Sequence, residues 1–454
     1  MNRDIIVAKF GGTSMADAPA IAQSAKVAIV NKVALVVVSA TSGTTNQLVE
    51  LVKSVLANNR SKTNKIIAVI SKSHRQAADE LEASQELLDE LESVLKSLQA
   101  AAHKLQTDTD NQKQISDRLL SFGELLSSIL MMAAMNQQAV KAEFIDAREV
   151  IKTDNHFGRA TPVIERIRGR SDRIIRSRLS ADKILITQGF IGSTRDGVTT
   201  TLGRGGSDYS AALLAEALDA DKLQIWTDVS GIASTDPRIA KTASRIEQLT
   251  FQEAAELATA GAKVLYPRTI TPLRRANIDL YVGNTFEPEA GGTTITNQTS
   301  HRPLVRAIAL KSNQSILSLT SPEMAHQFGY LARVFDIFAQ FKVSIDQIST
   351  SEISIAVVVD DQVLLNKALI NGLKQLGEVS TENDLSVVSM IGNEINNSPG
   401  LIQNIFANLE RKGAKVPVRM ICQGASRHNF CFLVPDKHGR NTVRRLHAAF
   451  IEDN

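Results

Sequence analysis

The sequence predicts an α/β sandwich with a largely parallel sheet, followed by two smaller α+β units. In the first part of the chain, short β-branched runs alternate with stretches of helical periodicity, which is typical of a parallel sheet covered by helices. The expected strands are residues 5–8, 34–39, 143–146, 184–188, 223–227 and 278–282. A long helix is expected over residues 79–105, where leucines recur at helical spacing. The chain is expected to divide near residues 297–303.

After residue 303, two segments repeat a plan of strand, helix and strand, and each closes with a further strand. The first repeat comprises residues 315–320, 329–341, 343–348 and 353–359. The second comprises residues 385–391, 400–412, 416–423 and 429–434. A repeat of this kind attached to a larger domain favours a regulatory role, although strand–helix repeats also serve as plain interfaces.

Composition indicates an ordinary globular protein of two or three domains. The 454 residues are 43% hydrophobic and 22% charged, and the net charge of +3 implies no polyanionic partner. The arginines between residues 166 and 178 follow a helical pattern without interleaved aromatic residues, so we expect a solvated helix face and no nucleic-acid binding. Cys422 and Cys431 show no metal-site or disulfide-framework spacing and are expected to be small buried hydrophobes.

The sequence also predicts the compartment. We expect no membrane span, because Lys32 interrupts the longest apolar candidate. The N-terminus has the pattern of a core strand and not of a signal peptide. The expected location is therefore cytoplasmic.

The most informative stretch covers residues 202–215, Leu-Gly-Arg-Gly-Gly-Ser-Asp followed by an apolar helical pattern. Its glycines leave backbone N–H groups exposed just before a helix, which makes a cradle for an anion. Arg204 adds a planar donor fork suited to a carboxylate or phosphate, and Asp208 could hold a metal or orient a cation. The alternative is a glycine-rich turn before a capped helix.

A second cradle lies at the N-terminus, where the first expected strand leads into Lys9, Gly11, Gly12, Thr13 and Ser14. Lys9 would emerge at the carboxyl end of a strand, where open α/β sheets bind ligands. Two such loops, each with a cation, suggest a polyphosphate. The chain has neither a P-loop motif nor the protein-kinase motifs, so a phosphoryl-transfer enzyme would follow another design.

At this point the motifs carry a resemblance. The chain resembles the aspartate kinases, in particular the monofunctional lysine-sensitive aspartokinase III group, over its whole length and in the family's motif order. The matching blocks are Lys9-Phe-Gly-Gly-Thr-Ser14, Phe122-Gly-Glu-Leu125, Thr187-Gln-Gly-Phe-Ile-Gly192, Thr201-Leu-Gly-Arg-Gly-Gly-Ser-Asp208 and Trp226-Thr-Asp228.

The resemblance implies an amino-acid-kinase-type three-layer sandwich over residues 1–297 and two ferredoxin-like ACT domains, the small-molecule sensors of amino-acid biosynthetic enzymes. The first ACT domain would comprise residues 313–383. It would be inserted into the second, formed by residues 303–312 and 384–454. The sensor surfaces would make a homodimer contact, with a tetramer as a further option. No residues remain for a homoserine dehydrogenase domain, so we expect a monofunctional enzyme.

The implied reaction transfers the γ-phosphoryl of ATP to the side-chain carboxylate of L-aspartate, with Mg²⁺ bound through the nucleotide. Because the nucleophile is already an anion, catalysis consists mainly of positioning and charge neutralisation. Lys9 is expected to stabilise the transferring phosphoryl group, Asp208 to organise Lys9 or the metal, and Lys263 to neutralise phosphate charge.

Substrate contacts follow from residue chemistry and from the motif match together. The Arg204 fork suits the α-carboxylate of aspartate, and Glu124 suits the α-ammonium, although a glutamate opening an apolar helix is more often a dipole partner. The remaining expected substrate contacts are Ser39, Thr45, Phe190, Gly205, Gly206 and Ser207. The expected nucleotide contacts are Lys9, Gly11, Gly12, Thr13, Ser14, Thr227, Asp228, Ala233, Arg238, Lys263 and Val264.

Some positions depart from the family pattern. Ser230 and Ala233 stand where similar aspartate kinases have proline and tyrosine, so we expect weaker nucleotide packing, or a nearby replacement for the aromatic side chain, without loss of activity. Tyr266 occupies a family histidine position.

The resemblance also implies a lysine effector site. Its expected members are Met324, Gln327, Gly329, Tyr330, Leu331, Ser344, Ile345, Asp346, Ser351 and Glu352. Asp346 and Glu352 are the physically sensible ligands, because carboxylates could engage the two ammonium groups of lysine. Gln327 replaces a serine, and Asp346 could alternatively be a turn residue.

Two other functions stay open at the sequence level. A kinase for glutamate or another carboxylate would share both glycine cradles and Lys9, whereas the Gly-Glu-Leu block and paired sensors favour aspartate. A non-catalytic amino-acid sensor would be expected to lose Lys9, Arg204, Asp208 or Lys263, and all of them are present.

Overall fold

The computed structural model describes residues 4–261, 265–410 and 416–452. The chain forms two compact units, each treated by itself below. The first, named the kinase unit after the resemblance described above, comprises Met1–Ile232, Arg245–Phe251 and Val264–Thr299. The second, the C-terminal unit, comprises Ala233–Ser244, Gln252–Lys263 and Ser300–Asn454.

An 8-stranded sheet forms the centre of the kinase unit, in the order β3-β4-β2-β1-β7-β9-β10-β8. The strands are β1 (Ile6–Phe10), β2 (Leu35–Val38), β3 (Lys141–Ile145), β4 (Lys183–Gln188), β7 (Lys222–Thr227), β8 (Gln248–Thr250), β9 (Asp279–Asn284) and β10 (Gly292–Thr296). Only β9 and β10 pair antiparallel; all other neighbours in this sheet are parallel. The predicted largely parallel sheet is confirmed, while β8 and β10 were not predicted because both are short and polar.

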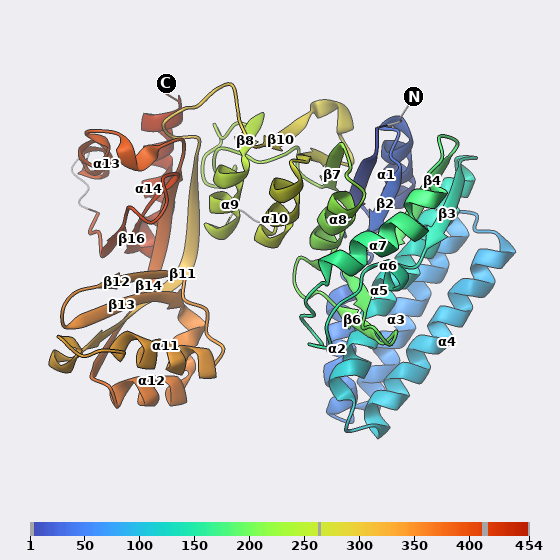
Figure 1. Ribbon diagram of the computed structural model, residues 1–454, viewed down its shortest axis with the longest axis horizontal. Coiled ribbons are helices and arrows are strands. Elements are labelled where there is room, and N and C mark those ends of the chain that lie inside the picture. The colour runs from blue at the N-terminus through green and yellow to red at the C-terminus, as the bar shows by residue number, and fades with distance from the viewer. Residues whose placement is uncertain (1–3, 262–264, 411–415, 453–454) are drawn as a thin grey trace. The chain divides into compact units, whose positions relative to one another are not determined.

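Helices cover both faces of this sheet (Figure 1). On one face lie α1 (Ala18–Val30) and α5 (Gln112–Gln137), which share a core with the inward residues of β1, β2 and β4. On the other lie α8 (Gly206–Ala217), α7 (Ile164–Ile174) and α10 (Pro267–Ala276). A small hairpin, β5 (Ile191–Ser193) with β6 (Thr199–Thr201), precedes α8. The three-layer prediction is therefore confirmed.

Three further helices extend from the layer that contains α5. They are α2 (Thr44–Leu56), α3 (Arg60–Glu80) and α4 (Gln85–Thr107), and they pack beside α5 (Figure 1). The single helix predicted over residues 79–105 is wrong, because α3 ends at Glu80 and α4 starts at Gln85. Glu82, between them, has a φ of 53°, which breaks the helical path despite the continuing leucine pattern.

Helix α5 bears on the expectation that the chain has no membrane span. Among the described residues it alone has the length and apolar composition of a membrane span, and 78% of its apolar window is buried inside the protein. Ser, Asn and Gly interrupt the apolar pattern of α5, so no continuous apolar span was evident there from the sequence.

The C-terminal unit is built on a 6-stranded sheet in the order β12-β13-β11-β14-β16-β15. Its strands are β11 (Ala307–Thr320), β12 (Gln347–Thr350), β13 (Ser354–Asp360), β14 (Glu378–Ile391), β15 (Met420–Cys422) and β16 (Asn429–Pro435). Its helices are α11 (Tyr330–Gln340), α12 (Lys367–Lys374), α13 (Leu401–Glu410) and α14 (Asp436–His447), with α9 (Phe251–Thr259) also assigned largely to this unit.

The predicted repeat is present in this sheet, with corrections. The strands β11 and β14 run as single long strands through both halves, whereas the sequence suggested separate short strands. The strand predicted at 343–348 is displaced to β12, the strand predicted at 416–423 is shortened to β15, and α12 and α14 were not predicted. Each half has its own apolar core, one around Val334 and Phe338 and the other around Phe430 and Phe432.

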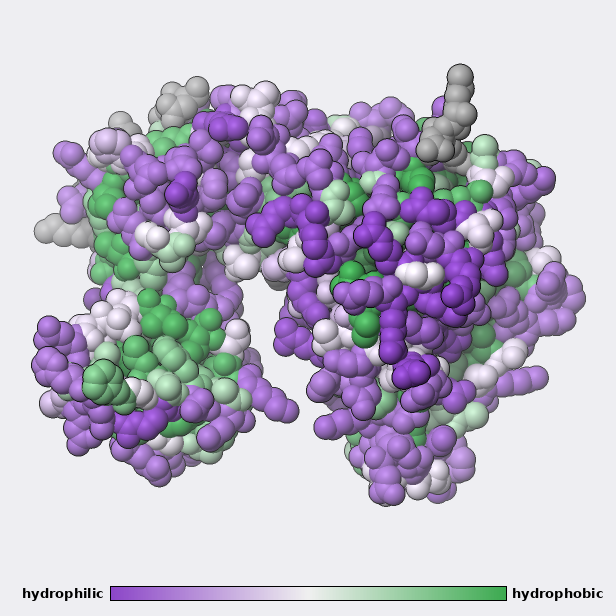
Figure 2. Space-filling view, in the orientation of Figure 1, coloured by the Kyte–Doolittle hydropathy of each residue, from purple (hydrophilic) through white to green (hydrophobic). Residues whose placement is uncertain are grey.

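The half that contains α11, β12 and β13 exposes apolar side chains, visible as green surface in Figure 2. Exposed apolar residues in this half are Phe328, Leu331, Phe341, Ile348, Ile353 and Leu365. Strand β12 is an edge strand of the sheet, so its outer backbone groups are unpaired within it.

Candidate active site

Lys9 and Asp208 meet at the carboxyl edge of the parallel sheet. Lys9 lies near the end of β1, and Asp208 lies in the first turn of α8. The ammonium Nζ of Lys9 is 2.6 Å from Oδ1 of Asp208, and the two side chains are only 11% and 16% exposed. The structure thus brings together two residues that lie almost 200 positions apart in the sequence, one from each glycine motif.

The glycine loop before α8 allows very close backbone packing. Gly205 has a φ of 71°, and a Cβ there would lie 2.2 Å from Cγ of Tyr266. A Cβ on Gly206 would lie 2.7 Å from Cδ2 of Phe190. Ser207 is half-buried next to them. Gly205 is therefore required by both packing and conformation, and Gly206 by packing.

Phe190 is held in a strained backbone conformation beside this loop. Its φ is 65°, its N–H donates to the Ser210 hydroxyl at 2.9 Å, and its carbonyl accepts from Leu202 N–H. Strain of this kind concentrates at functional sites. Arg204 is exposed, and its guanidinium makes no hydrogen bond or ion pair to any residue that the structure describes.

Glu124 lies in the middle of α5, so it does not open a helix, and the dipole-partner alternative is wrong. Its side chain is buried, and Oε1 accepts a hydrogen bond from Ala40 N–H at 3.2 Å. Its Oε2 has no partner within the described residues. Burial raises the pKa of Glu124 to about 8, opposed by the Ala40 N–H and the positive charge of Lys9. A buried carboxylate with one free oxygen is arranged to receive a cationic group.

The loop between β2 and α2 carries Ser39 and Thr45. Ser39 is buried at the end of β2, and its N–H donates to Phe10 at 3.2 Å. Thr45 is exposed in the first turn of α2.

His74 of α3 supports this loop from below and was not identified from the sequence. Its Nδ1 donates to the Ile70 carbonyl at 2.8 Å, so Nε2 accepts from the Thr41 hydroxyl at 3.2 Å. Thr41 in turn lies 2.6 Å from the Thr44 hydroxyl. Burial lowers the pKa of His74, which keeps the ring neutral. A lone histidine in a helix gave no signal of this contact.

The N-terminal turn after β1 is held by hydrogen bonds to β7 and to Thr285. Gly11 donates to the Trp226 carbonyl at 2.9 Å, which ties the turn to β7, and Gly12 and Thr13 follow in the same turn. Ser14 is fully buried, and its hydroxyl bonds to Thr285 at 2.6 Å and to the Trp226 carbonyl at 3.2 Å. Ser14 is therefore already satisfied by protein groups.

The predicted nucleotide residues divide between the two units. Thr227 ends β7 in the kinase unit and Asp228 follows it, and the Thr227 hydroxyl donates to the Asp228 carboxylate at 3.0 Å. Ala233 and Arg238 belong to the C-terminal unit, where Arg238 forms a bidentate pair with Asp236. Lys263 and Val264 lie outside the described residues.

Asp117 of α5 is a further supporting residue that the sequence did not reveal. Its buried carboxylate accepts from Gly158 N–H at 2.9 Å and from the N–H and hydroxyl of Thr201 at 2.8 and 2.9 Å. Burial raises the pKa of Asp117, and these donors oppose the shift. Asp117 thereby ties the strand that leads into the glycine loop to α5.

The predicted effector residues surround the start of α11 and strand β12. Gly329 caps α11 with a φ of 76°, and Met324, Tyr330 and Ile345 pack against one core. The Tyr330 hydroxyl is committed to the Leu376 carbonyl at 2.6 Å.

The polar members of this set have partners of their own. The Gln327 side chain accepts from Arg333 at 2.7 Å, and the Ser351 hydroxyl bonds to Ser354 at 2.7 Å. Leu331, Ser344 and Glu352 are exposed.

Asp346 already holds an ammonium group. Lys311 of β11 forms an ion pair with Asp346 and approaches Asp360 at 3.5 Å. Asp346 also donates its N–H to Val358 at 3.1 Å, so it is not simply a turn residue. Lys311 was missed because it lies 35 residues from Asp346 within a polar stretch of strand.

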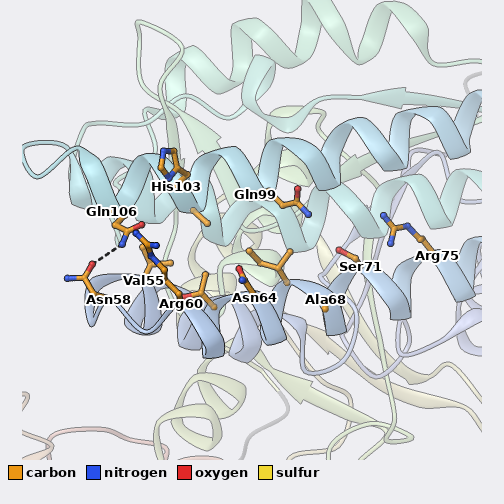
Figure 3. Close-up of a pocket in the computed structure, with 13 residues that line it drawn as sticks. Val55, Asn58, Arg60, Asn64, Ala68, Ser71, Arg75, Gln99, His103 and Gln106 are labelled. Carbon is orange, nitrogen blue, oxygen red and sulfur yellow. Dashed lines mark hydrogen bonds between the residues drawn. The ribbon is translucent and has the colours of Figure 1, made fainter.

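No cluster of three or more potential metal ligands occurs within the described parts of the chain. A hollow of about 800 Å³ lies between α2, α3 and α4, where a hydrogen bond from Gln106 to Asn58 at 3.0 Å closes one end (Figure 3). None of the predicted site residues lines it.

Comparison with known proteins agrees with the geometry of the site. Residues 4–284 match the amino acid kinase family, and residues 317–369 and 388–450 match the ACT domain. The lysine-sensitive aspartokinase 3 of Escherichia coli is 41% identical over 99% of this chain and 100% of its own length.

Solved structures give the same relationship. The E. coli aspartokinase III complex with aspartate and ADP (R-state) has a TM-score of 0.87 at 41% identity, covering 98% of this chain and 99% of that one. The complex with lysine and aspartate (T-state) has a TM-score of 0.85 at 41% identity, covering 99% and 100%. A family match over more than half of the chain and this full-length identity lead to one conclusion: the chain belongs to the aspartokinases of the amino acid kinase family.

Proposed function

We propose that this protein transfers the γ-phosphoryl group of ATP to the side-chain carboxylate of L-aspartate, giving 4-phospho-L-aspartate and ADP. The observation that carries the proposal is the buried Glu124. Its Oε2 has no partner in the described structure, and the positive charge of Lys9 partly offsets the rise in the Glu124 pKa that burial causes. One amino-acid substrate would then bring its ammonium to Glu124 and its reactive carboxylate toward Lys9.

Lys9 and Asp208 form the catalytic pair in this proposal. The Asp208 carboxylate keeps the Lys9 ammonium at the end of β1. A fixed positive charge there offsets the repulsion between an anionic nucleophile and a triphosphate, which is the main barrier to this reaction. Lys263 would contribute a further positive charge.

The nucleotide would bring a bound Mg²⁺ ion, which would supply positive charge to neutralise the phosphates. The Asp208 carboxylate, next to Lys9, would be a suitable ligand for this ion. Gly11, Gly12 and Thr13 offer backbone donors for phosphate oxygens, with Thr227, Asp228, Ala233, Arg238 and Val264 as further nucleotide contacts. Ser14 supports that turn from inside, because its hydroxyl is bonded to the protein.

A second group would recognise the α-carboxylate of aspartate, in addition to Glu124 for the α-ammonium. Arg204 is exposed and unpaired within the described chain, so its fork is available for the α-carboxylate. Ser39, Thr45, Phe190, Gly205, Gly206 and Ser207 would line the pocket around it. The strained Phe190 and the tight glycine loop support a preformed pocket.

L-lysine is the proposed feedback inhibitor. The related E. coli enzyme is named lysine-sensitive and has been solved with lysine and aspartate. Asp346 and Glu352 would receive the two ammonium groups, and the pairing of Asp346 with Lys311 supports its affinity for such a group. The first ACT domain would be residues 313–383, inserted into a second formed by residues 303–312 and 384–454. The continuous strands β11 and β14 support that arrangement.

We further propose a cytoplasmic homodimer formed through the ACT domains. The apolar side chains Leu331, Ile348 and Ile353 and the open edge of β12 support a contact on that face. A tetramer would be a second level of this assembly.

The test is ATP-dependent formation of an acyl phosphate, trapped as a hydroxamate with hydroxylamine. L-Aspartate should give product, L-glutamate should not, and added L-lysine should reduce the yield. Product from glutamate but not from aspartate would overturn the substrate assignment. Aspartate turnover that is insensitive to lysine would overturn the effector assignment alone.

A further inference from the structure

Residues 233–244, here named the nucleotide segment, leave the kinase unit and return to it. The segment belongs to the C-terminal unit, whereas Ile232 before it and Arg245 after it belong to the kinase unit. Its ends are fixed within the kinase unit, where Ile246 N–H donates to Ile232 at 2.8 Å and Ile232 N–H donates to the Thr293 hydroxyl at 2.8 Å. The segment contains Ala233 and Arg238, both proposed nucleotide contacts.

Helix α14 holds this segment at successive turns. Arg440 donates to the Arg238 carbonyl at 2.5 Å, and Arg444 donates to the Ile239 carbonyl at 2.8 Å. One turn further on, His447 Nε2 lies 2.8 Å from the Ser234 hydroxyl. The Ile239 side chain completes the contact by packing into the core of Val443 and Leu446.

Ser234 is bonded through all of its polar groups. Its N–H donates to the Ser244 carbonyl at 2.8 Å, and its carbonyl accepts from Ile308 N–H of β11 at 2.8 Å. Its hydroxyl oxygen accepts from Ser244 N–H at 3.1 Å and faces His447. Ser234 and His447 are 2% and 0% exposed, so none of these bonds competes with bulk water.

The partner on the other side of the ring determines the direction of the Ser234–His447 bond. His447 Nδ1 lies 2.6 Å from Oε1 of Glu452, and an ionised carboxylate accepts only, so Nδ1 donates. In the neutral ring, Nε2 then accepts the Ser234 hydroxyl proton. Thr242 of the segment donates to the same Glu452 oxygen. Each donor in the hydrogen-bond series from Ser244 N–H through Ser234 and His447 to Glu452 thus has an acceptor.

We propose that Ser234 and His447 are positioning residues for the nucleotide, which hold Ala233 and Arg238 in the geometry that binds ATP. This inference rests on the proposed kinase function and adds residues that do not themselves touch the substrates. Helix α14 also packs against β11 and β14, so the proposed support for these two nucleotide contacts comes from within the C-terminal unit. Removing the bond to His447 leaves the proton of the buried Ser234 hydroxyl without an acceptor and allows the segment to relax.

The experiment compares His447→Gln with His447→Asn in the full-length protein. A glutamine amide reaches the position of Nε2 and keeps a bond to Ser234, whereas an asparagine amide reaches the position of Nδ1 and keeps the bond to Glu452. Asn441→Ala, an exposed position on α14, is the control for general effects on the helix. The measurements are the KM values for ATP and aspartate, kcat, the Kd for ADP and the melting temperature.

We expect His447→Asn and Ser234→Ala to raise the KM for ATP and the Kd for ADP about tenfold, with little change in the KM for aspartate. His447→Gln should stay near wild type, and so should Asn441→Ala. Equal ADP affinity in all these proteins, or equal loss in the Gln and Asn variants, would overturn the positioning role. If the wild-type protein failed to phosphorylate aspartate, the proposed function would be rejected instead. The two failures are distinguishable, because the Kd for ADP is measured independently of turnover.

Discussion

Lys9 Nζ lies 2.6 Å from Asp208 Oδ1, and this pair joins the two glycine loops of the kinase unit into one site. A partly buried pair of opposite charges is not retained for stability alone, because desolvation offsets much of its attraction. Its value lies in holding an ammonium group at a defined place, in front of the sheet edge where ligands bind.

Replacement of Asp208 tests this arrangement. Asp208→Asn keeps the shape of the side chain but removes its charge, so the Lys9 ammonium loses its fixed position. We expect kcat to fall about 10- to 100-fold while the KM for aspartate changes little. Steady-state kinetics with the hydroxamate assay provide the measurement. A kcat within twofold of wild type would mean that Asp208 does not organise Lys9.

The raised pKa of Glu124 predicts a pH dependence of aspartate binding. At pH 6.5 the free protein holds Glu124 mostly protonated, because burial raises its pKa to about 8. An ammonium ligand needs the carboxylate form, so the KM for aspartate should fall as the pH rises from 6.5 toward 8.5. Glu124→Gln should have a higher KM that no longer changes with pH in this range. A pH-dependent KM that persists in Glu124→Gln would assign the effect to another group.

The same carboxylate affects folding stability with a definite sign. Since its pKa is raised from 4.5 in the folded state, the folded protein binds more protons between pH 4.5 and about 8 than the unfolded chain does. The contribution of Glu124 to the free energy of unfolding therefore decreases as the pH rises through that range. Chemical denaturation at several pH values should show a weaker decrease for Glu124→Gln than for wild type. Identical slopes would contradict the shifted pKa.

Lys311 acts as an internal competitor of the effector in this account. Its ammonium pairs with Asp346, the residue proposed to receive an ammonium of L-lysine. Lys311→Met should free Asp346 and lower the concentration of lysine that gives half inhibition about tenfold, with basal activity retained. Asp346→Ala should abolish inhibition. Unchanged inhibition in Lys311→Met would mean that the effector does not use Asp346.

The glycine loop predicts a paired suppression. Gly205→Ala introduces a Cβ that would lie 2.2 Å from Tyr266 Cγ at a φ of 71°, so both melting temperature and kcat should fall. Adding Tyr266→Ala should remove the two closest contacts, with Cγ and Cδ1 of the ring, and recover part of the loss, leaving the backbone strain and the 2.7 Å approach to Cβ of residue 266. The double variant is compared with each single variant in thermal unfolding and in the hydroxamate assay. No recovery in the double variant would show that the clash with Tyr266 is not the cause.

Local sequence patterns predicted the strands that carry the site, because β1, β2, β4 and β7 are buried aliphatic runs with clear ends. They did not predict the break between α3 and α4, since the apolar pattern continues across Leu81 while Glu82 adopts a positive φ. Motifs indicated Lys9 and Asp208, which lie beside glycines. His74, Lys311 and His447 carry no local motif, and their contacts exist only through packing between distant segments.

The most direct measurement is a comparison of Lys9→Ala with wild type in acyl-phosphate formation and in ADP and aspartate binding. We expect kcat to fall roughly a thousandfold while both ligands still bind, because Lys9 acts mainly on the charge that moves during transfer. Turnover close to wild type in Lys9→Ala would contradict the central claim that this lysine stabilises the transferring phosphoryl group.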